Sequence, residues 1–123
     1  MGTVSVERYR VPVCEREIPL RTGAGLRLTR MDIDPANAEE AAEVYGATAV
    51  PSLAETDGFC AALLFLDRRT GHSIGETIWL NPQRLAASRS AAAAVRVETV
   101  ALTGCVIRAV EEYGLVFSSA RYP

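Results

Sequence analysis

Lysine is missing from this 123-residue sequence, and histidine occurs only once, at His72. All 13 basic residues are therefore arginine, a bias that we attribute to GC-rich bacterial coding. They stand against 15 acidic residues, giving a formal charge of -2, and they form no basic run. The sequence therefore lacks the electrostatic footprint of a nucleic-acid-binding protein. A single histidine also gives little support to a metal site. It does not form a catalytic triad either, because the neighbouring Ser73 points to the opposite face of a strand.

Cysteine is scarce too, with three residues at Cys14, Cys60 and Cys105. Their wide spacing and the lack of a CxxC pair argue against a disulfide scaffold and against zinc. Cys60 and Cys105 lie in apolar runs, where we expect free thiols to behave as small buried hydrophobic side chains. No stretch approaches the roughly 18 apolar residues of a membrane helix, and the charged start of the chain does not resemble a signal segment. We predict a cytoplasmic protein that makes no membrane contact.

What the sequence does contain is enough apolar material for one folded domain. Hydrophobic residues make up 49% and charged residues 23%, as in ordinary globular proteins. We predict an N-terminal extended arm or edge strand over residues 1–24 and the domain itself over residues 25–123. Within the arm, Val4 to Val13 alternates in polarity as a strand does. Pro12 and Pro19 withhold backbone donors, which places such a strand at a sheet edge.

The domain begins with a strand and a helix. Alternation over Leu26 to Ile33 predicts the strand. Asp34-Pro35 is typical of a helix start, because the carboxylate caps the first turn and proline suits the first helical position. Ala36 to Tyr45 is rich in alanine and glutamate, which are good helix formers. Gly46 and Pro51 then predict that this helix breaks or kinks.

A hairpin, a second helix and a last strand follow. Phe59 to Leu66 is apolar throughout and predicts a strand that is buried on both faces, with Ser73 to Leu80 as its hairpin partner. Asn81-Pro82 repeats the helix-start signal, and the composition predicts a helix from Gln83 to Leu102. Cys105 to Ser118 predicts a long strand. We expect a stripe of mostly small helical residues to lie against the sheet: Leu85, Ser88, Ala92, Val95, Thr99 and Leu102.

The order β-α-β-β-α-β predicts an α+β, ferredoxin-like fold: an antiparallel sheet with two helices on one face, preceded by the extra N-terminal strand or arm. Because Phe59 to Leu66 is apolar on the other face too, we predict a homodimer through the open sheet face. The segment Val6–Tyr9 is echoed by Val110–Tyr113, 104 positions later. This similarity has three possible explanations. It is a coincidence, the arm is the remnant of the last strand of an upstream repeat, or the arm is a strand that adds to the edge of a sheet.

Short motifs mark the ends of these strands. Gly58-Phe59 opens the second strand of the domain, Leu64 to Arg68 with Thr70-Gly71 closes it, and Thr77-Ile78-Trp79 leads directly into a helix. Together with the last-strand motif, this arrangement resembles the antibiotic biosynthesis monooxygenase-like family of the dimeric α/β-barrel superfamily. The resemblance covers Leu26 to Ser118 and implies a dimeric barrel of ferredoxin-like subunits. Members of the superfamily include cofactor-free oxygenases of polyketide-type phenols, haem-degrading enzymes and many proteins of unknown activity.

The haem-degrading branch is tested by its motif residues. Its tryptophan before the second helix matches Trp79, but Ser88 and Arg89 occupy the neighbourhood of its haem-ligating histidine. Its first-strand asparagine is also missing from Leu26 to Asp34. Gly23-Ala24-Gly25 precedes a strand and therefore does not form a nucleotide-binding turn. We expect no haem, flavin, nicotinamide or other cofactor.

The resemblance places a ligand pocket between the helices and the sheet, where four residues are candidates for binding a small aromatic or polyketide-like compound. Trp79 would stack on a ring, Tyr45 would hydrogen-bond a carbonyl or phenol, and Arg27 or Arg30 would pair with an anion. Each has another interpretation: Trp79 as a core residue, Tyr45 as a helix cap, and the arginines as solvated rim residues. No catalytic residue is assigned. We expect a small-molecule-binding protein similar to cofactor-independent monooxygenases; the alternative is a non-catalytic ligand-binding or dimerisation module.

Overall fold

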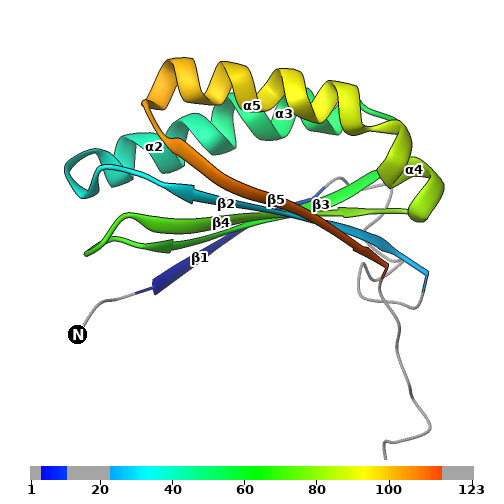
Figure 1. Cartoon of the computed structure of the whole chain (residues 1–123), viewed down its shortest axis with the longest axis horizontal. Coiled ribbons are helices and arrows are strands. Elements are labelled where there is room, and N and C mark those ends of the chain that lie inside the picture. Colours follow the sequence, from blue (N-terminus) through cyan, green and yellow to red (C-terminus); the bar gives the residue numbers. More distant parts are fainter. Residues whose placement is uncertain (1–3, 11–22, 115–123) are drawn as a thin grey trace, which may run out of the picture.

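The protein is built on one five-stranded antiparallel sheet (Figure 1). The computed structural model describes residues 4–10 and 23–114. Across the sheet the strands lie in the order β1-β3-β4-β2-β5. Their bounds are Val4–Arg10 for β1, Gly25–Asp32 for β2, Phe59–Asp67 for β3, His72–Trp79 for β4 and Val106–Gly114 for β5.

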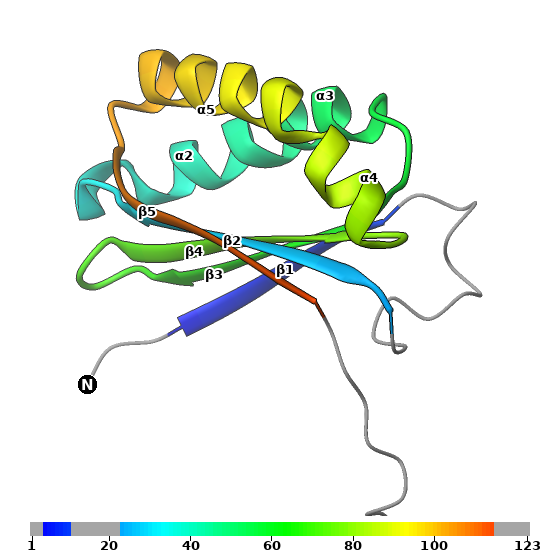
Figure 2. The same ribbon diagram turned by 45° about the vertical axis from the view of Figure 1, so that its right-hand side comes forward.

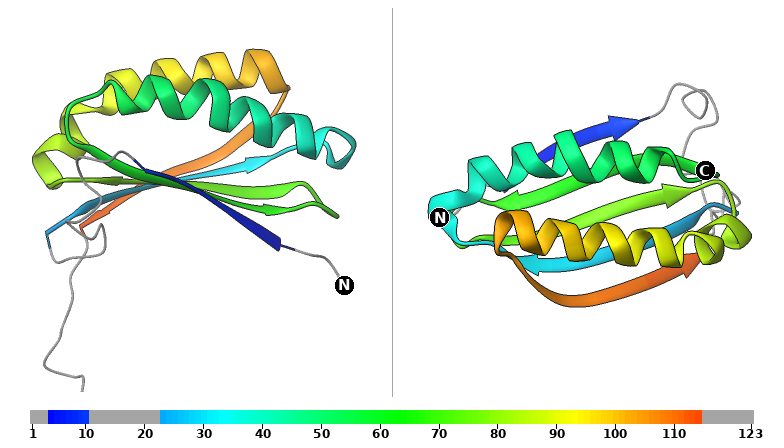
Figure 3. Two further views of the ribbon diagram at one scale, coloured as in Figure 1. Left: turned by 180° about the vertical axis from the view of Figure 1, so that it is seen from behind. Right: turned by 90° about the horizontal axis from the view of Figure 1, so that it is seen from above.

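The helices all lie on one face of this sheet (Figures 1 and 2). Seen from above, the helical segments form two rows that lie side by side over the strands (Figure 3). The first follows β2 and the second follows β4. The helical segments are a 3-10 turn at Pro35–Asn37, α2 at Ala38–Val44, a π-helical turn at Tyr45–Ala49, α3 at Val50–Ala54, α4 at Pro82–Ala87 and α5 at Arg89–Thr103.

This arrangement confirms the predicted ferredoxin-like fold. Strands β2 and β4 occupy the middle of the four-stranded unit, and the helices connect each of them to an outer strand. The N-terminal strand β1 extends the sheet by pairing with β3, in a register that sets Val4 opposite Asp67 and Arg10 opposite Ala61. It is an edge strand, so only one of its sides pairs with the described sheet.

Both helix-start signals act as the sequence predicts. The Asp34 side chain accepts a hydrogen bond from the backbone N–H of Ala36 at 3.0 Å. The Asn81 side chain accepts one from the backbone N–H of Arg84 at 2.8 Å. Each cap satisfies a donor that has no partner within its own helix, which fixes where the chain leaves the strand.

The helix after β2 does not break, but it is irregular in the region where Gly46 and Pro51 predict a break or a kink. The chain stays helical from Ala38 to Ala54. A π-helical turn at Tyr45–Ala49 takes up one extra residue, and Pro51 then lies in the first turn of α3. Proline is tolerated there because its missing N–H removes less of the hydrogen-bond ladder than it would in a helix interior.

The second helix, predicted to be continuous from Gln83 to Leu102, is interrupted at Ser88. The Ser88 hydroxyl donates to the Leu85 carbonyl oxygen at 2.7 Å, a bond that competes with regular helix geometry. A turn separates α4 from α5 at this point. The predicted stripe holds for its first half, since Leu85, Ser88 and Ala92 are buried, but Leu102 is 55% exposed and does not face the sheet.

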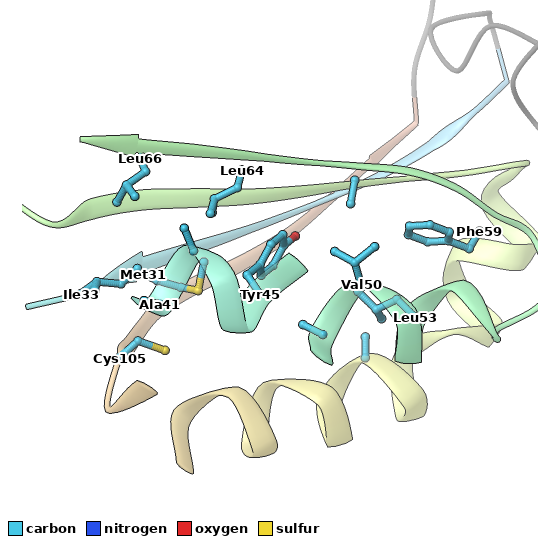
Figure 4. Packing of buried hydrophobic residues seen from close by; sticks show 14 of the residues in the cluster. Met31, Ile33, Ala41, Tyr45, Val50, Leu53, Phe59, Leu64, Leu66 and Cys105 are labelled. Carbon is cyan, nitrogen blue, oxygen red and sulfur yellow. The ribbon is translucent and has the colours of Figure 1, made fainter. Parts of the chain in front are cut away.

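The hydrophobic core fills the space between the sheet and the helices (Figure 4). Leu64 and Leu66 of β3 and Trp79 of β4 are almost wholly buried there. Tyr45 and Leu53 reach them from the helical side of the core. The thiols of Cys60 and Cys105 are buried, as predicted.

The opposite face of the sheet carries no helix among the described residues. Near one end it is covered enough to bury Ala61 and Ile78, which pack in a second small cluster with Leu26 and Leu63 at its margin. Farther along, Phe65 remains partly exposed, and β1 and β5 leave Val6 and Tyr113 each 48% exposed. We refer to this surface as the open face.

Some sequence predictions fall outside the described residues. These are the continuation of the arm beyond Arg10, the thiol of Cys14 and the last strand beyond Gly114.

Candidate functional site

A narrow cavity of about 40 Å³ lies between the helices and the sheet. Its apolar lining comes from both layers and includes Met31, Leu53 and Ile107. Tyr45 projects from its helix toward the sheet within this space (Figure 4). The polar residues of the lining are Arg27, Thr29, Tyr45, Thr77, Arg96 and Thr99.

Arg27 is the best-anchored of these polar groups. It is only 3% exposed, because β2 points it at the helices. Its guanidinium donates to Glu112 of β5 at 2.8 and 3.2 Å, to the Ser88 hydroxyl at 3.0 Å and to the Leu85 carbonyl at 3.0 Å. The break between α4 and α5 is what leaves the last two acceptors within its reach. Arg27 therefore ties β2, β5 and the helix break together.

Glu112 is shared between two arginines. Arg89, at the start of α5, donates to it from two nitrogens, the shorter distance being 2.8 Å. Hydrogen bonding to Arg89, and then to Arg27, outweighs partial burial and lowers the pKa of Glu112 below its ordinary value. Glu112 in turn raises the pKa of Arg89. This carboxylate is committed to these two partners.

Arg96 lies two helical turns after Arg89, on the same side of α5, and it lines the cavity. It makes no hydrogen bond or ion pair within the described part of the chain. Partial burial, followed by the like charge of Arg27, lowers the pKa of Arg96 below its usual range, while Glu112 acts weakly in the other direction. The site therefore contains a guanidinium whose charge is not neutralised.

Tyr45 is positioned at the cavity by a glycine on the sheet. It begins the π-helical turn and is 9% exposed. A Cβ atom added to Gly75 of β4 would lie 3.1 Å from the Tyr45 hydroxyl and 3.5 Å from the terminal methyl of Met31. The absence of a side chain at Gly75 is thus what allows the ring to approach the sheet.

Trp79 lies outside the cavity lining. Its side chain is fully buried, its indole N–H donates to the Thr77 hydroxyl at 2.9 Å, and its ring meets that of Phe59 edge-on at 5.4 Å. The Arg27 guanidinium carbon lies 5.8 Å from the centre of the Trp79 ring. These contacts are those of a residue that holds the end of β4 and supports Arg27.

The structure separates the two arginines of the first strand. Arg30 lies three residues after Arg27 in β2, so its side chain projects from the opposite side of the sheet, the open face. It pairs there with Glu111 at 3.1 Å. A broad hollow of about 450 Å³ lies beside it on that face. Its charged groups are largely paired with one another, with Asp32 contacting both His72 at 2.9 Å and Arg108 at 2.6 Å. Its lining residues are Arg30, Met31, Asp32, Phe65, Asp67, His72, Ser73, Ile74 and Arg108.

Sequence reasoning missed three residues of the cavity region: Ser88, Glu112 and Arg96. Ser88 was placed in the buried stripe but not linked to an arginine, and Glu112 was counted only as part of a strand motif. Arg96 follows the buried residue Ala92 by one helical turn, so it was a charged residue bordering the predicted stripe. This position next to the predicted stripe is the sequence signal that distinguishes Arg96 from an arginine on a solvated helix face.

Neither a metal-binding cluster nor a membrane-spanning helix occurs among the described residues. No group of three or more His, Cys, Asp or Glu side chains lies close enough together to hold a metal ion. Nor does any helix there have the length and hydropathy needed to cross a bilayer.

No family model matches the sequence. Two uncharacterised proteins of Mycobacterium tuberculosis are similar to it. Rv2558 is 26% identical over 123 residues, which is 99% of this chain and 52% of the relative. Rv2557 is 29% identical over 73 residues, or 59% of this chain and 33% of the relative. The chain thus spans about half the length, or less, of the curated relatives it matches.

Solved structures allow a comparison of the fold. MupZ from Pseudomonas fluorescens superposes with a TM-score of 0.59 at 14% identity, over 76% of this chain and 73% of MupZ. An anthrone oxidase-like protein gives 0.54 at 22% identity, over 77% of this chain and 43% of that protein. LmHde, a haem-degrading enzyme from Listeria monocytogenes, gives 0.57 at 8% identity, over 92% and 69%. The chain shares its fold with these proteins. The resemblance drawn from the sequence motifs is therefore confirmed for the fold, and identities this low carry no activity with them.

Proposed function

We propose that this protein binds a small organic molecule in the cavity between its helices and its sheet. The observation that carries this proposal is the composition of the lining: an apolar floor with hydroxyl and guanidinium groups converging on it from β2, β4 and α5. Small-molecule sites combine apolar walls with a few placed polar groups in this way. A core that needed only to be packed would not require charged groups at that position.

Cavity size favours binding over enclosed oxidation. About 40 Å³ accepts a group of a few heavy atoms, whereas pockets that enclose a whole drug-sized ligand begin near ~300 Å³. A larger ligand would therefore insert only one end, with its remainder outside the cavity. This geometry supports a non-catalytic binding module more than an oxygenase.

Cofactor-free oxygenation of an anthrone-type compound is the second candidate, favoured by the similarity in fold to the anthrone oxidase-like protein. Tyr45 would then help to bind the substrate's phenol or carbonyl, and Arg27 and Arg96 would favour its anion. Oxygen uptake with anthrone as substrate tests this candidate. Uptake above that of a buffer blank, lost in Tyr45→Phe and kept in Tyr113→Phe, would establish oxygenation and overturn the preference for binding alone.

Binding itself is tested with two glycine variants and a neutral probe, benzyl alcohol. Gly75→Ala places a methyl group against Tyr45 at the cavity, whereas a Cβ at Gly114 has no atom within 4 Å. We expect benzyl alcohol, followed by NMR shifts of the labelled protein, to move the signals of Thr29 and Thr77. The affinity should fall about tenfold in Gly75→Ala and stay unchanged in Gly114→Ala. Absence of shifts at the cavity, or equal affinity in both variants, would refute the proposal.

The protein's partner in this proposal is a second copy of itself, seated on the open face. Leu63, Phe65 and Ile74 line this face and are only partly buried, while Val6 and Tyr113 each remain 48% exposed. A contiguous apolar sheet face of this kind favours association. Pairing two such faces closes a barrel and leaves the ligand cavity of each copy on its outer, helical side.

Sedimentation of matched variants tests the dimer. Leu63→Asp places a charge on the open face, and Val97→Asp places one on the outer side of α5, where Val97 is 71% exposed. We expect the wild type and Val97→Asp to sediment at twice the 13.2 kDa chain mass and Leu63→Asp to sediment at the chain mass. A monomeric wild type would end this part of the proposal. The buried thiol of Cys105, which forms no disulfide among the described residues, supports a reducing, cytoplasmic setting in a bacterium.

A further inference from the structure

Three arginines, Arg27, Arg89 and Arg96, lie near a single carboxylate beside the cavity, that of Glu112. Arg27 and Arg89 both bond Glu112, with closest distances of 2.8 Å each. Arg96 lies beside them without a bonded carboxylate in the described chain. No acidic residue belongs to the described lining of the cavity. The positive charge of Arg96 is therefore left over after the local pairs have formed.

The guanidinium of Arg96 is partly buried, has no bonded counter-charge and lies next to a second guanidinium that is almost completely buried, so a negative charge at this position would be favourable. Arg27 cannot relieve it, because it has the same sign and is bound to four acceptor contacts. Glu112 cannot move to it without abandoning Arg27. A negatively charged group supplied from outside is the remaining way to neutralise Arg96.

We propose that the ligand carries a carboxylate, and that Arg96 pairs with it at the cavity. This inference rests on the proposed binding function and names the chemical class of the ligand. The planar guanidinium suits a carboxylate because its N–H groups bond both oxygens at once. The cavity volume of about 40 Å³ matches a group of three heavy atoms better than a ring.

The neighbouring residues give the carboxylate further support. Thr29 and Thr77 bring hydroxyl groups from adjacent strands, and Met31 and Ile107 provide apolar surface for the adjoining carbon atoms. Arg27 contributes its field without being displaced, since its own bonds fix it in place. In this arrangement Arg96 contacts the ligand, whereas Arg27 is a positioning residue that acts through Glu112 and Ser88.

Benzoate and benzyl alcohol form a matched pair of probes for this inference, since they share a ring and differ in charge. Each is titrated, to about 20 mM, into wild type, Arg96→Gln and Arg69→Gln while amide NMR shifts are recorded. Arg69→Gln is the control because it removes the same charge from an exposed turn between β3 and β4. We expect the wild type and Arg69→Gln to bind benzoate at least about tenfold more tightly than benzyl alcohol.

In Arg96→Gln we expect the affinity for benzoate to fall about tenfold and that for benzyl alcohol to change less than about twofold. Arg96→Lys keeps the charge and should retain part of the benzoate preference, which a merely structural role would not require. Equal affinity of wild type for both probes would overturn the carboxylate inference and leave the binding function standing. A benzoate preference that survives Arg96→Gln would also overturn it. If neither probe shifts the cavity residues, the proposed binding function falls and the inference falls with it.

The thermal stability of Arg96→Met gives a check that needs no ligand. If Arg96 is kept for a ligand, removing its unpaired charge while keeping its apolar stem should leave the melting temperature of the free protein unchanged or raise it. A drop of several degrees would mean that Arg96 supports the fold itself, and would overturn its assignment to a ligand.

Discussion

Glu112→Gln is the substitution that tests the buried charge cluster most directly. It keeps the shape of the side chain and removes the charge that compensates Arg27, which is 3% exposed while Glu112 is 21% exposed. Breaking a buried pair costs about 3–5 kcal/mol when one charge is left uncompensated. Glu112 is not fully buried and the glutamine oxygen still accepts a hydrogen bond, so we expect a loss of about 2–3 kcal/mol in the free energy of unfolding.

Glu111→Gln is its matched control, one residue away on the other side of the same strand. Its partner Arg30 is 45% exposed and Glu111 is 35% exposed, so this surface pair should contribute less than about 1 kcal/mol. Urea unfolding of both variants at one protein concentration measures the difference. With a slope of about 2 kcal/mol per molar, Glu112→Gln should lower the midpoint by about 1–1.5 M and Glu111→Gln by less than about 0.5 M. Equal shifts in the two variants would refute the reasoning.

Three further outcomes follow from the same contacts. The pKa of Glu112 is lowered in the folded protein, so its contribution to the free energy of unfolding is complete above its unfolded pKa of about 4.3 and is lost as the pH falls through the lower folded value. Urea unfolding should therefore show a stability difference between wild type and Glu112→Gln that is constant near neutral pH and shrinks below about pH 4. Trp79→Phe leaves a void and removes the donor to Thr77, and calorimetry should show a loss of about 2–4 kcal/mol. Gly71→Ala should cost at least about 2 kcal/mol in the same assay, because Gly71 has φ of +83° and an added Cβ would lie 1.7 Å from the Ile33 carbonyl oxygen.

Much of the fold was predictable because its signals are local. Alternating polarity identified the strands, and the two cap-and-proline pairs, beginning at Asp34 and Asn81, marked where each helical layer starts. The order of the elements then restricted the topology to very few arrangements. The apolar run from Phe59 to Leu66 in β3 correctly predicted one face under the helices and a second face that is also apolar.

The interruption at Ser88 was not predictable, because part of what stabilises it is a contact over a long sequence separation. Alanine-rich sequence on both sides favours an unbroken helix, and the bonds that stabilise the break come from Arg27, 61 positions earlier. The candidate site was affected in the same way. Arg27 and Tyr45 were brought to one cavity as expected of a helix–sheet pocket, whereas Arg30 was assigned to it only because the strand's inward side had not been determined.

The π-helical turn changes the angle between successive side chains of the helix, and this decides which of them face the cavity. Ala41, Tyr45, Ala49 and Leu53 are all buried at intervals of four residues. In a regular α-helix each such step overshoots a full rotation by about 40°, so Leu53 would face about 120° away from Ala41. The wider turn absorbs most of that drift. One helix can therefore present Tyr45 and Leu53 to the same narrow space. If the turn became regular α-helix with all of its residues kept, one of these side chains would swing out of that space.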